Sequence, residues 1–413
     1  MVRLIGFELK KIISRPSSII MLLIILAINC ITIFLGTGDI DIQFKDKEIY
    51  KAEQSQYAGE INQIWRELIQ LRLQTVIDNP DNLMTLDEKK EVKEYYLQQG
   101  YTKDYVDNLP NILLVKSSVE YSIAYRVIRN AEYDSRFYNN ARNFSINIGN
   151  NLRRKFQGKK GDVIGGKAEK MYSNLAKNYT AYYNYHLGWD KLSSMQRILP
   201  FTVGVFLFIT LSPIFSLEYS CRTDSLLLSS KHGKSKLAHA KILTGFFMAI
   251  GIWIFVQLTN LVMVASLFSL KGAETFVQDW VNNYSPFPFT QLTNYIAVSF
   301  MSFIGVMFFA SIILFISSRA KSPFVSILVG GVVLLSPIII EGIGKSGGSI
   351  YNVLMFMPVN VLIATQHFSL FNAYYVFKNA FLMQLAVPLV AIIISAIIIP
   401  IACQKFQHHQ VEN

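Results

Sequence analysis

Charge is the scarcest property of this sequence. Only 16% of its 413 residues are Asp, Glu, Lys or Arg, whereas 52% are hydrophobic. A soluble protein carries about 25% charged residues, so the deficit indicates a membrane protein and argues against a cytosolic enzyme. Cysteine is scarce too, because Cys30 and Cys403 lie in apolar runs and Cys221 lies in a polar loop. The long polar segment contains none, which excludes a disulfide framework there.

The sequence also lacks the residue patterns of catalysis and metal binding. It has no H-E-x-x-H motif and no paired cysteines, and its one histidine pair, His408 and His409, stands in a terminal tail. The apolar runs contain almost no ionisable side chains, with Glu218 and Glu341 at their ends. Ion-coupled carriers and proton pumps place such groups inside the membrane. We expect no catalytic residue, no metal and no cofactor bound by this chain, so the energy for any transport comes from elsewhere.

One glycine-rich segment resembles a nucleotide-binding loop. The segment GDVIGGKA (161–168) fits G-x-x-x-x-G-K, but Ala168 stands where Ser or Thr would hold magnesium, and no predicted strand precedes it. We interpret it as a turn between two helices. A second such segment, GIGKSGGS (342–349), is interpreted as a loop.

Six apolar segments are long enough to cross a membrane as helices, which takes about 20 residues each. They are residues 16–36, 198–217, 242–270, 295–318, 323–341 and 381–402. We expect an all-α polytopic membrane protein, whose first span is retained because no A-x-A-like cleavage site follows it. A further apolar piece, within residues 351–372, is interrupted by Pro358. It is either a packed re-entrant hairpin, which we favour, or an interfacial segment on the outer surface.

Lysine and arginine are concentrated before the first span, between the second and third, between the fourth and fifth, and after the sixth. With six spans these segments lie on one side, which the positive-inside rule assigns to the cytoplasm. Both termini, including the tail 403–413, are therefore expected in the cytoplasm. The net charge of +11 largely reflects this bias, so nucleic acid is not an expected partner.

Residues 1–15 have the pattern of an amphipathic helix on the inner membrane surface. The apolar residues that share a face are Leu4, Ile5, Leu9, Ile12 and Ile13. Glu8, Lys10 and Lys11 are expected to point away from that face. The alternative is a simple basic anchor before the first span. Membrane lipids are expected partners.

Residues 37–197 are polar and, by the same topology, form an extracytoplasmic domain. Amphipathic spacing predicts a helix over residues 57–77, which ends before an Asn-Pro pair. Thr85 and Glu88 have capping-box spacing, as do Ser117 and Glu120. We expect a mostly helical domain of four or five helices.

The charge of this domain is divided unevenly. Residues 39–134 carry 12 basic and 18 acidic side chains, whereas residues 135–195 carry 11 basic and 3 acidic ones. The two halves attract each other or pack on partner copies, which we favour. Alternatively, the basic run 150–160 contacts anionic lipid headgroups or a charged ligand.

The cytoplasmic segment 218–241 combines a glutamate, a leucine triplet and several basic residues. With the amphipathic segment before span one, the six spans and the short apolar piece between spans five and six, it resembles permease subunits of ABC-2 type ATP-binding-cassette exporters. In that family a Glu-containing stretch, a coupling helix and a basic residue follow span two; Glu218 with Tyr219, the stretch TDSLLLSS and Lys241 stand there. Family members often have Glu, a basic residue and Gly-Thr, whereas this chain has Cys-Arg-Thr at 221–223.

The resemblance implies two permease chains, the same or related, driven by a dimer of separate cytoplasmic ATPase subunits that bind ATP and magnesium. The residues that would couple to the ATPase are Glu218, Tyr219, Arg222, Ser225, Leu226, Leu227, Leu228 and Ser229. The three leucines would fill an apolar groove on the ATPase.

We expect a permease in the plasma membrane of a bacterium, exporting an amphipathic compound such as an antimicrobial peptide, a drug or a lipid-linked molecule. The large outer domain occurs only in some family members, so the resemblance does not define the substrate. Gln257 and Asn260 in span three are either hydrogen-bonding groups between helices, which we favour, or contacts on a substrate path. The alternative function is a membrane sensor or scaffold whose outer domain binds a ligand without transport.

Overall fold

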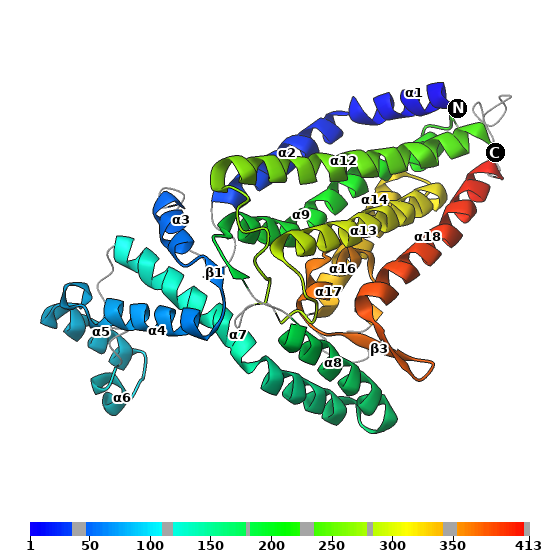
Figure 1. Cartoon of the computed structure of the whole chain (residues 1–413). Coiled ribbons are helices and arrows are strands. Elements are labelled where there is room, and N and C mark those ends of the chain that lie inside the picture. The colour runs from blue at the N-terminus through cyan, green and yellow to red at the C-terminus, as the bar shows by residue number, and fades with distance from the viewer. Residues whose placement is uncertain are drawn as a thin grey trace.

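The computed structural model describes residues 1–34, 47–109, 119–178, 182–223, 235–278, 284–341 and 353–408. Within them, five helical stretches are long and apolar enough to cross a membrane. They are α2 (Pro16–Phe34), α9 (Leu187–Leu211) with α10 (Pro213–Ser220), α12 (Lys236–Phe268), α13 (Gln291–Arg319) and α18 (Met383–Gln407). These helices pack in one bundle (Figure 1). The fold is predominantly helical and compatible with a multi-pass membrane protein.

The predicted fifth span is also a helix, α14 (Pro323–Glu341). It has 19 residues, close to the roughly 20 that a span needs. Of the six expected spans, five are candidate membrane-crossing helices among the described residues, and the other one is this 19-residue helix. The N-terminal segment forms α1 (Val2–Ile13), and Figure 1 shows α1 and α2 in succession along one side of α12.

The ends of several helices differ from the predicted spans. Helix α9 begins at Leu187, well before residue 198, because its first turns are anchored: Trp189 and Leu192 are buried, and the Trp189 indole donates to the Leu270 carbonyl at 3.2 Å. Helix α12 likewise begins earlier than residue 242. Helix α18 continues to Gln407, so the predicted tail 403–413 begins inside a helix.

The segment between α2 and α9, here called the insert, contains six α-helices in its described residues rather than four or five. They are α3 (Lys47–Gln56), α4 (Gln63–Asp78), α5 (Leu86–Gln98), α6 (Lys103–Asp107), α7 (Val119–Phe156) and α8 (Gly158–Asn178), with a 3-10 turn at Pro80–Asn82. Strand β1 (Gly59–Glu60) pairs antiparallel with β2 (Tyr182–Tyr183). Figure 1 places α3 to α6 at the opposite end of the bundle from both termini.

Local capping explains two helix starts in the insert. The predicted capping box is confirmed, since the Thr85 backbone donates to the Glu88 carboxylate at 2.7 Å and the Thr85 hydroxyl caps α5. Asn62 caps α4 by accepting from the Trp65 amide at 2.9 Å. The second predicted pair begins at Ser117, which lies outside the described residues.

The interpretation of residues 161–168 as a turn is wrong, because they lie inside α8. The turn between α7 and α8 is at Gln157 and Gly158, which both have positive φ. Within α8, a β-carbon on Gly161 would lie 2.7 Å from the Arg153 carbonyl oxygen, and one on Gly165 would lie 2.6 Å from that of Gly149. Glycine is needed here for the close approach of two helix backbones.

Two short buried helices and a β-hairpin precede α18. Helices α16 (Pro358–Leu362) and α17 (Thr365–Ser369) pack among α9, α13, α14 and α18, and every residue of α16 is buried. Strands β3 (Ala373–Val376) and β4 (Asn379–Leu382) form an antiparallel hairpin against α8, where Lys167 donates to the Ala380 carbonyl at 2.6 Å. The predicted loop 342–349 lies outside the described residues.

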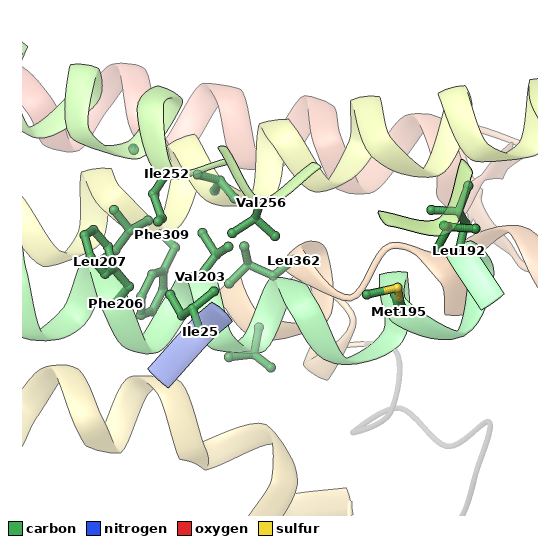
Figure 2. Packing of buried hydrophobic residues seen from close by; sticks show 14 of the residues in the cluster. Ile25, Leu192, Met195, Val203, Phe206, Leu207, Ile252, Val256, Phe309 and Leu362 are labelled. Carbon is green, nitrogen blue, oxygen red and sulfur yellow. The ribbon is translucent and has the colours of Figure 1, made fainter. Parts of the chain in front are cut away.

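The bundle core is built from apolar residues of α2, α9, α12, α13 and α16. Figure 2 shows side chains of these helices meeting, among them Ile25, Val203, Phe206, Leu207, Ile252, Val256, Phe309 and Leu362. Each of these side chains is at most 5% exposed. The bundle therefore holds α9 and α12 in a fixed relation. This also fixes the positions of Glu218, in the helix that follows α9, and of Lys241 in α12.

Candidate functional site

A buried lysine near the start of α12 joins this helix to α1 and α10. The Lys241 side chain, in the second turn of α12, is fully buried. Its ammonium lies 2.6 Å from a Glu218 carboxylate oxygen and 3.1 Å from one of Glu8. It also donates to the Ile214 carbonyl at 3.0 Å. An ammonium has three N–H donors, so each has a partner.

The partners of Lys241 come from distant parts of the chain. Glu8 belongs to α1 and Glu218 to α10, and their side chains are only 6% and 4% exposed. Lys11 of α1 adds a second cation, 3.5 Å from Glu218, and is more exposed at 35%. We call Glu8, Lys11, Glu218 and Lys241 the charge cluster. It ties the N-terminal helix to both ends of the segment between α10 and α12.

The charges of this cluster are stable in the protein interior only when their partners are present. Buried charges are tolerated when they are paired and hydrogen-bonded, whereas removing one partner leaves an uncompensated charge at a cost of about 3–5 kcal/mol. Arg15 lies nearby: burial lowers the pKa of its guanidinium, and the negative charges of Glu8 and Glu218 oppose that shift. The two carboxylates thus favour the charged form of Arg15, but its burial outweighs them.

Comparison with known proteins gives no relative for this chain. No protein-family model, curated protein or solved structure matches it. The resemblance to ABC-2 permeases therefore rests on the sequence features given above.

The break between α9 and α10 explains how Glu218 is held. Pro213 begins α10 as its first residue, so the amides of the next turn lack helical partners. The Ser317 hydroxyl of α13 accepts from the amides of Phe215 and Ser216 at 3.1 and 3.4 Å, and it donates to the Ser212 carbonyl at 2.6 Å. A single serine on a neighbouring helix therefore fixes the start of α10.

The other end of α10 is closed by a backbone motif. The Thr223 amide donates to the Glu218 carbonyl at 3.1 Å, and the Arg222 amide donates to the Tyr219 carbonyl at 3.2 Å. This is the Schellman pattern, in which the residue after the C-cap takes a left-handed conformation. Arg222 has φ 55°, so a non-glycine residue adopts the left-handed conformation that glycine favours.

The predicted coupling residues divide into described and undescribed ones. Glu218 is buried in the charge cluster, Tyr219 is half-buried with its hydroxyl 3.3 Å from the Ser318 carbonyl, and Arg222 is exposed. The remaining predicted positions lie outside the described residues; they are Ser225, Leu226, Leu227, Leu228 and Ser229. Glu218 therefore pairs with Lys11 and Lys241 inside the protein, and only 4% of its side chain is exposed for contact with another protein.

The two candidate substrate-path residues lie in different surroundings. Gln257 of α12 accepts a hydrogen bond from the Tyr295 hydroxyl of α13 at 3.0 Å, which joins two helices. Asn260 is 1% exposed, and neither polar atom of its side chain has a hydrogen-bond partner within the described part of the chain. The described residues also contain no group of three His, Cys, Asp or Glu that is suited to a metal ion.

Sequence reasoning missed Glu8, which was expected to point away from the apolar face of the first helix. It is instead buried on the same side as Ile12. One signal was present: Glu8 is the first acidic residue, and the next is Asp39. A single glutamate among four basic residues before an apolar run suggests an internal ion pair, because an exposed acidic residue there would oppose the basic excess.

Proposed function

We propose that this chain is the permease subunit of a bacterial ATP-binding-cassette exporter, which moves an amphipathic compound with ATP hydrolysed by separate cytoplasmic subunits. The observation that carries this proposal is the charge cluster. It joins the two ends of the segment between α10 and α12, which is the predicted ATPase contact, to α1. In this proposal, the cluster end of the bundle faces the cytoplasm and the insert lies outside.

The cluster suits the transfer of motion from that segment into the bundle. The 2.6 Å pair between Lys241 and Glu218 joins α12 to α10, and Ser317 joins α10 to α13. A push on the intervening segment would therefore displace α1, α10, α12 and α13 together. A loosely attached loop would instead absorb the same push without moving the helices.

The distribution of ionisable groups supports an energy source outside this chain. Helix α13 has no Asp, Glu, Lys or Arg before Arg319, and α18 has none before Lys405. A proton or ion relay needs such groups at membrane depth. ATP and magnesium would be held by the partner ATPase.

Exposed apolar surface supports lipids and a second permease chain as partners. In their most apolar 18-residue stretches, α18 has only 17% of its residues buried and α2 only 28%. A soluble monomer rarely leaves so much apolar surface uncovered. Lipid tails and another copy of this chain, or a related one, would cover it.

The test is co-purification of an ATPase with the tagged chain from the membranes of its own host. We expect a P-loop ATPase to co-purify with the wild type and to be lost when Leu226, Leu227 and Leu228 are all changed to Asp. Lys405→Glu, at the same end of the bundle, is the control and should keep the ATPase. If no ATPase co-purifies with the wild type, or if the leucine variant retains it, the sensor or scaffold function replaces this proposal.

A further inference from the structure

An apolar groove of about 490 Å³ runs between α1, α2, α9 and α12. Two stripes with helical spacing line it: Ile5, Leu9 and Ile13 on α1, and Phe247, Gly251 and Phe255 on α12. Residues four apart share a helix face, so each stripe forms one continuous wall. The volume lies within the roughly 300–1,000 Å³ that is typical of small-molecule sites.

Gly251 creates the central hollow of the α12 wall. It stands between two phenylalanines on the stripe, and a β-carbon placed on it would meet no atom within 4 Å. The glycine therefore does not serve close packing within the chain, unlike Gly161 and Gly165. Its lack of a side chain leaves space that something else can fill.

The groove is open on one side and closed on the other. Ile13 and Phe247 at its mouth are 55% and 51% exposed, whereas Phe206 and Ile252 at its floor are 4% and 5% exposed. Ser18 is the one polar side chain among the described lining residues, and its hydroxyl already donates to the Ile12 carbonyl at 2.7 Å. The apolar lining therefore favours a hydrocarbon chain over a polar ligand.

The charge beside the groove selects the kind of lipid. Helix α1 carries the exposed Arg3 and Lys10 in addition to Lys11, which pairs with Glu218, and its one acidic residue, Glu8, pairs with Lys241. Lys10 is exposed and adjacent in sequence to the groove residue Leu9. We propose that this groove binds one acyl chain of an anionic phospholipid, whose phosphate contacts the exposed basic residues of α1, Arg3 and Lys10. The proposal requires only that the bundle is embedded in a membrane and does not depend on transport.

Lipid retention tests this site. The chain is purified in detergent, freed of lipid and titrated with phosphatidylglycerol or phosphatidylcholine of equal chain length, and bound lipids are counted by native mass spectrometry. We expect one tightly bound phosphatidylglycerol per chain in the wild type and its loss in Gly251→Phe, which fills the hollow. Val262→Phe adds bulk at a 65% exposed position on the same helix, outside the groove, and should retain the lipid.

A second variant keeps the test independent of folding. Lys10→Gln changes an exposed side chain and should weaken phosphatidylglycerol binding about fivefold, with phosphatidylcholine binding unchanged. The proposal is overturned if Gly251→Phe keeps the bound lipid, or if the two lipids bind the wild type equally well. Either result leaves the ATPase co-purification unaffected, so the two proposals fail separately.

Discussion

Replacing Lys241 with methionine tests the charge cluster most directly. Methionine keeps the length and apolar stem of lysine but removes the cation, so two carboxylates that are 4% and 6% exposed lose their closest partner. With an effective dielectric constant of 20, the pairs at 2.6 and 3.1 Å are worth roughly 6 and 5 kcal/mol of gross attraction. Desolvation and relaxation offset much of this, so we expect a net loss of about 3–5 kcal/mol in unfolding free energy.

The assay is equilibrium unfolding in mixed detergent and SDS micelles. Lys236→Met, at the exposed start of the same helix, is the matched control and should lie within about 0.5 kcal/mol of the wild type. The triple change Glu8→Met, Glu218→Met and Lys241→Met removes the three buried charges and should recover part of the loss, because the two cations that remain, Lys11 and Arg15, are only half-buried. A Lys241→Met variant as stable as its control, or a triple variant no better than the single one, would refute the reasoning.

Two predictions concern the insert. Gly165→Ala should destabilise the α7–α8 hairpin by about 1–3 kcal/mol, because its β-carbon would clash with the backbone of α7. The control is Gly166→Ala, whose β-carbon meets nothing within 4 Å and which should be neutral or stabilising by up to about 1 kcal/mol. Equal effects of the two variants in thermal unfolding would contradict the close-packing explanation. Burial raises the pKa of the Tyr172 hydroxyl, which donates to the Tyr284 carbonyl. The folded state therefore favours neutral tyrosine, and its contribution, complete below the unfolded value of 10.0, should be lost as the pH rises above it. Tyr172→Phe should flatten the fall in unfolding midpoint between about pH 9 and 11, and an unchanged slope would count against this assignment.

Apolar length is a property of the sequence alone, which is why α2, α12, α13 and α18 were predicted well. The capping box at Thr85 was equally accessible, because its two residues are three positions apart and interact within one turn. The start of α9 was not, since the polar residues before 198 become helical through contacts such as that of Trp189 with Leu270. Such contacts depend on the approach of a different helix.

The same residue type gave different outcomes at different sites. Glycines in 161–168 favoured a turn by their intrinsic preference, but Gly161 and Gly165 are one helical turn apart and face another backbone. The hairpin of β3 and β4 was missed for the opposite reason. Its turn residues, Phe377 and Lys378, both have positive φ without being glycine or asparagine, so no ordinary turn signal marks it.

Half of the charge cluster was within reach of sequence reasoning. Glu218 and Lys241 flank the segment between two apolar runs, and both were placed there in advance. Their direct pairing and the role of Glu8 required the packing of α1 on α12. Lys241 and Glu8 are 233 residues apart in the sequence, so their contact can be recognised only in the tertiary structure.

Helix α18 connects regions at opposite ends of the molecule. At its start, β4 leads directly into it, and that strand is bonded to α8 of the insert through Lys167. Near its end, the ring of Phe406 lies 5.1 Å from that of Phe215, in the helix that carries Glu218. With 25 residues, the helix is about 38 Å long, and Pro388 and Pro400 lie near its two ends. Proline lacks a backbone N–H, so α18 loses one helical hydrogen bond at each of these two positions. We therefore expect a tilt of the insert to bend α18 at Pro388 and Pro400 while the two ends of the helix keep their contacts.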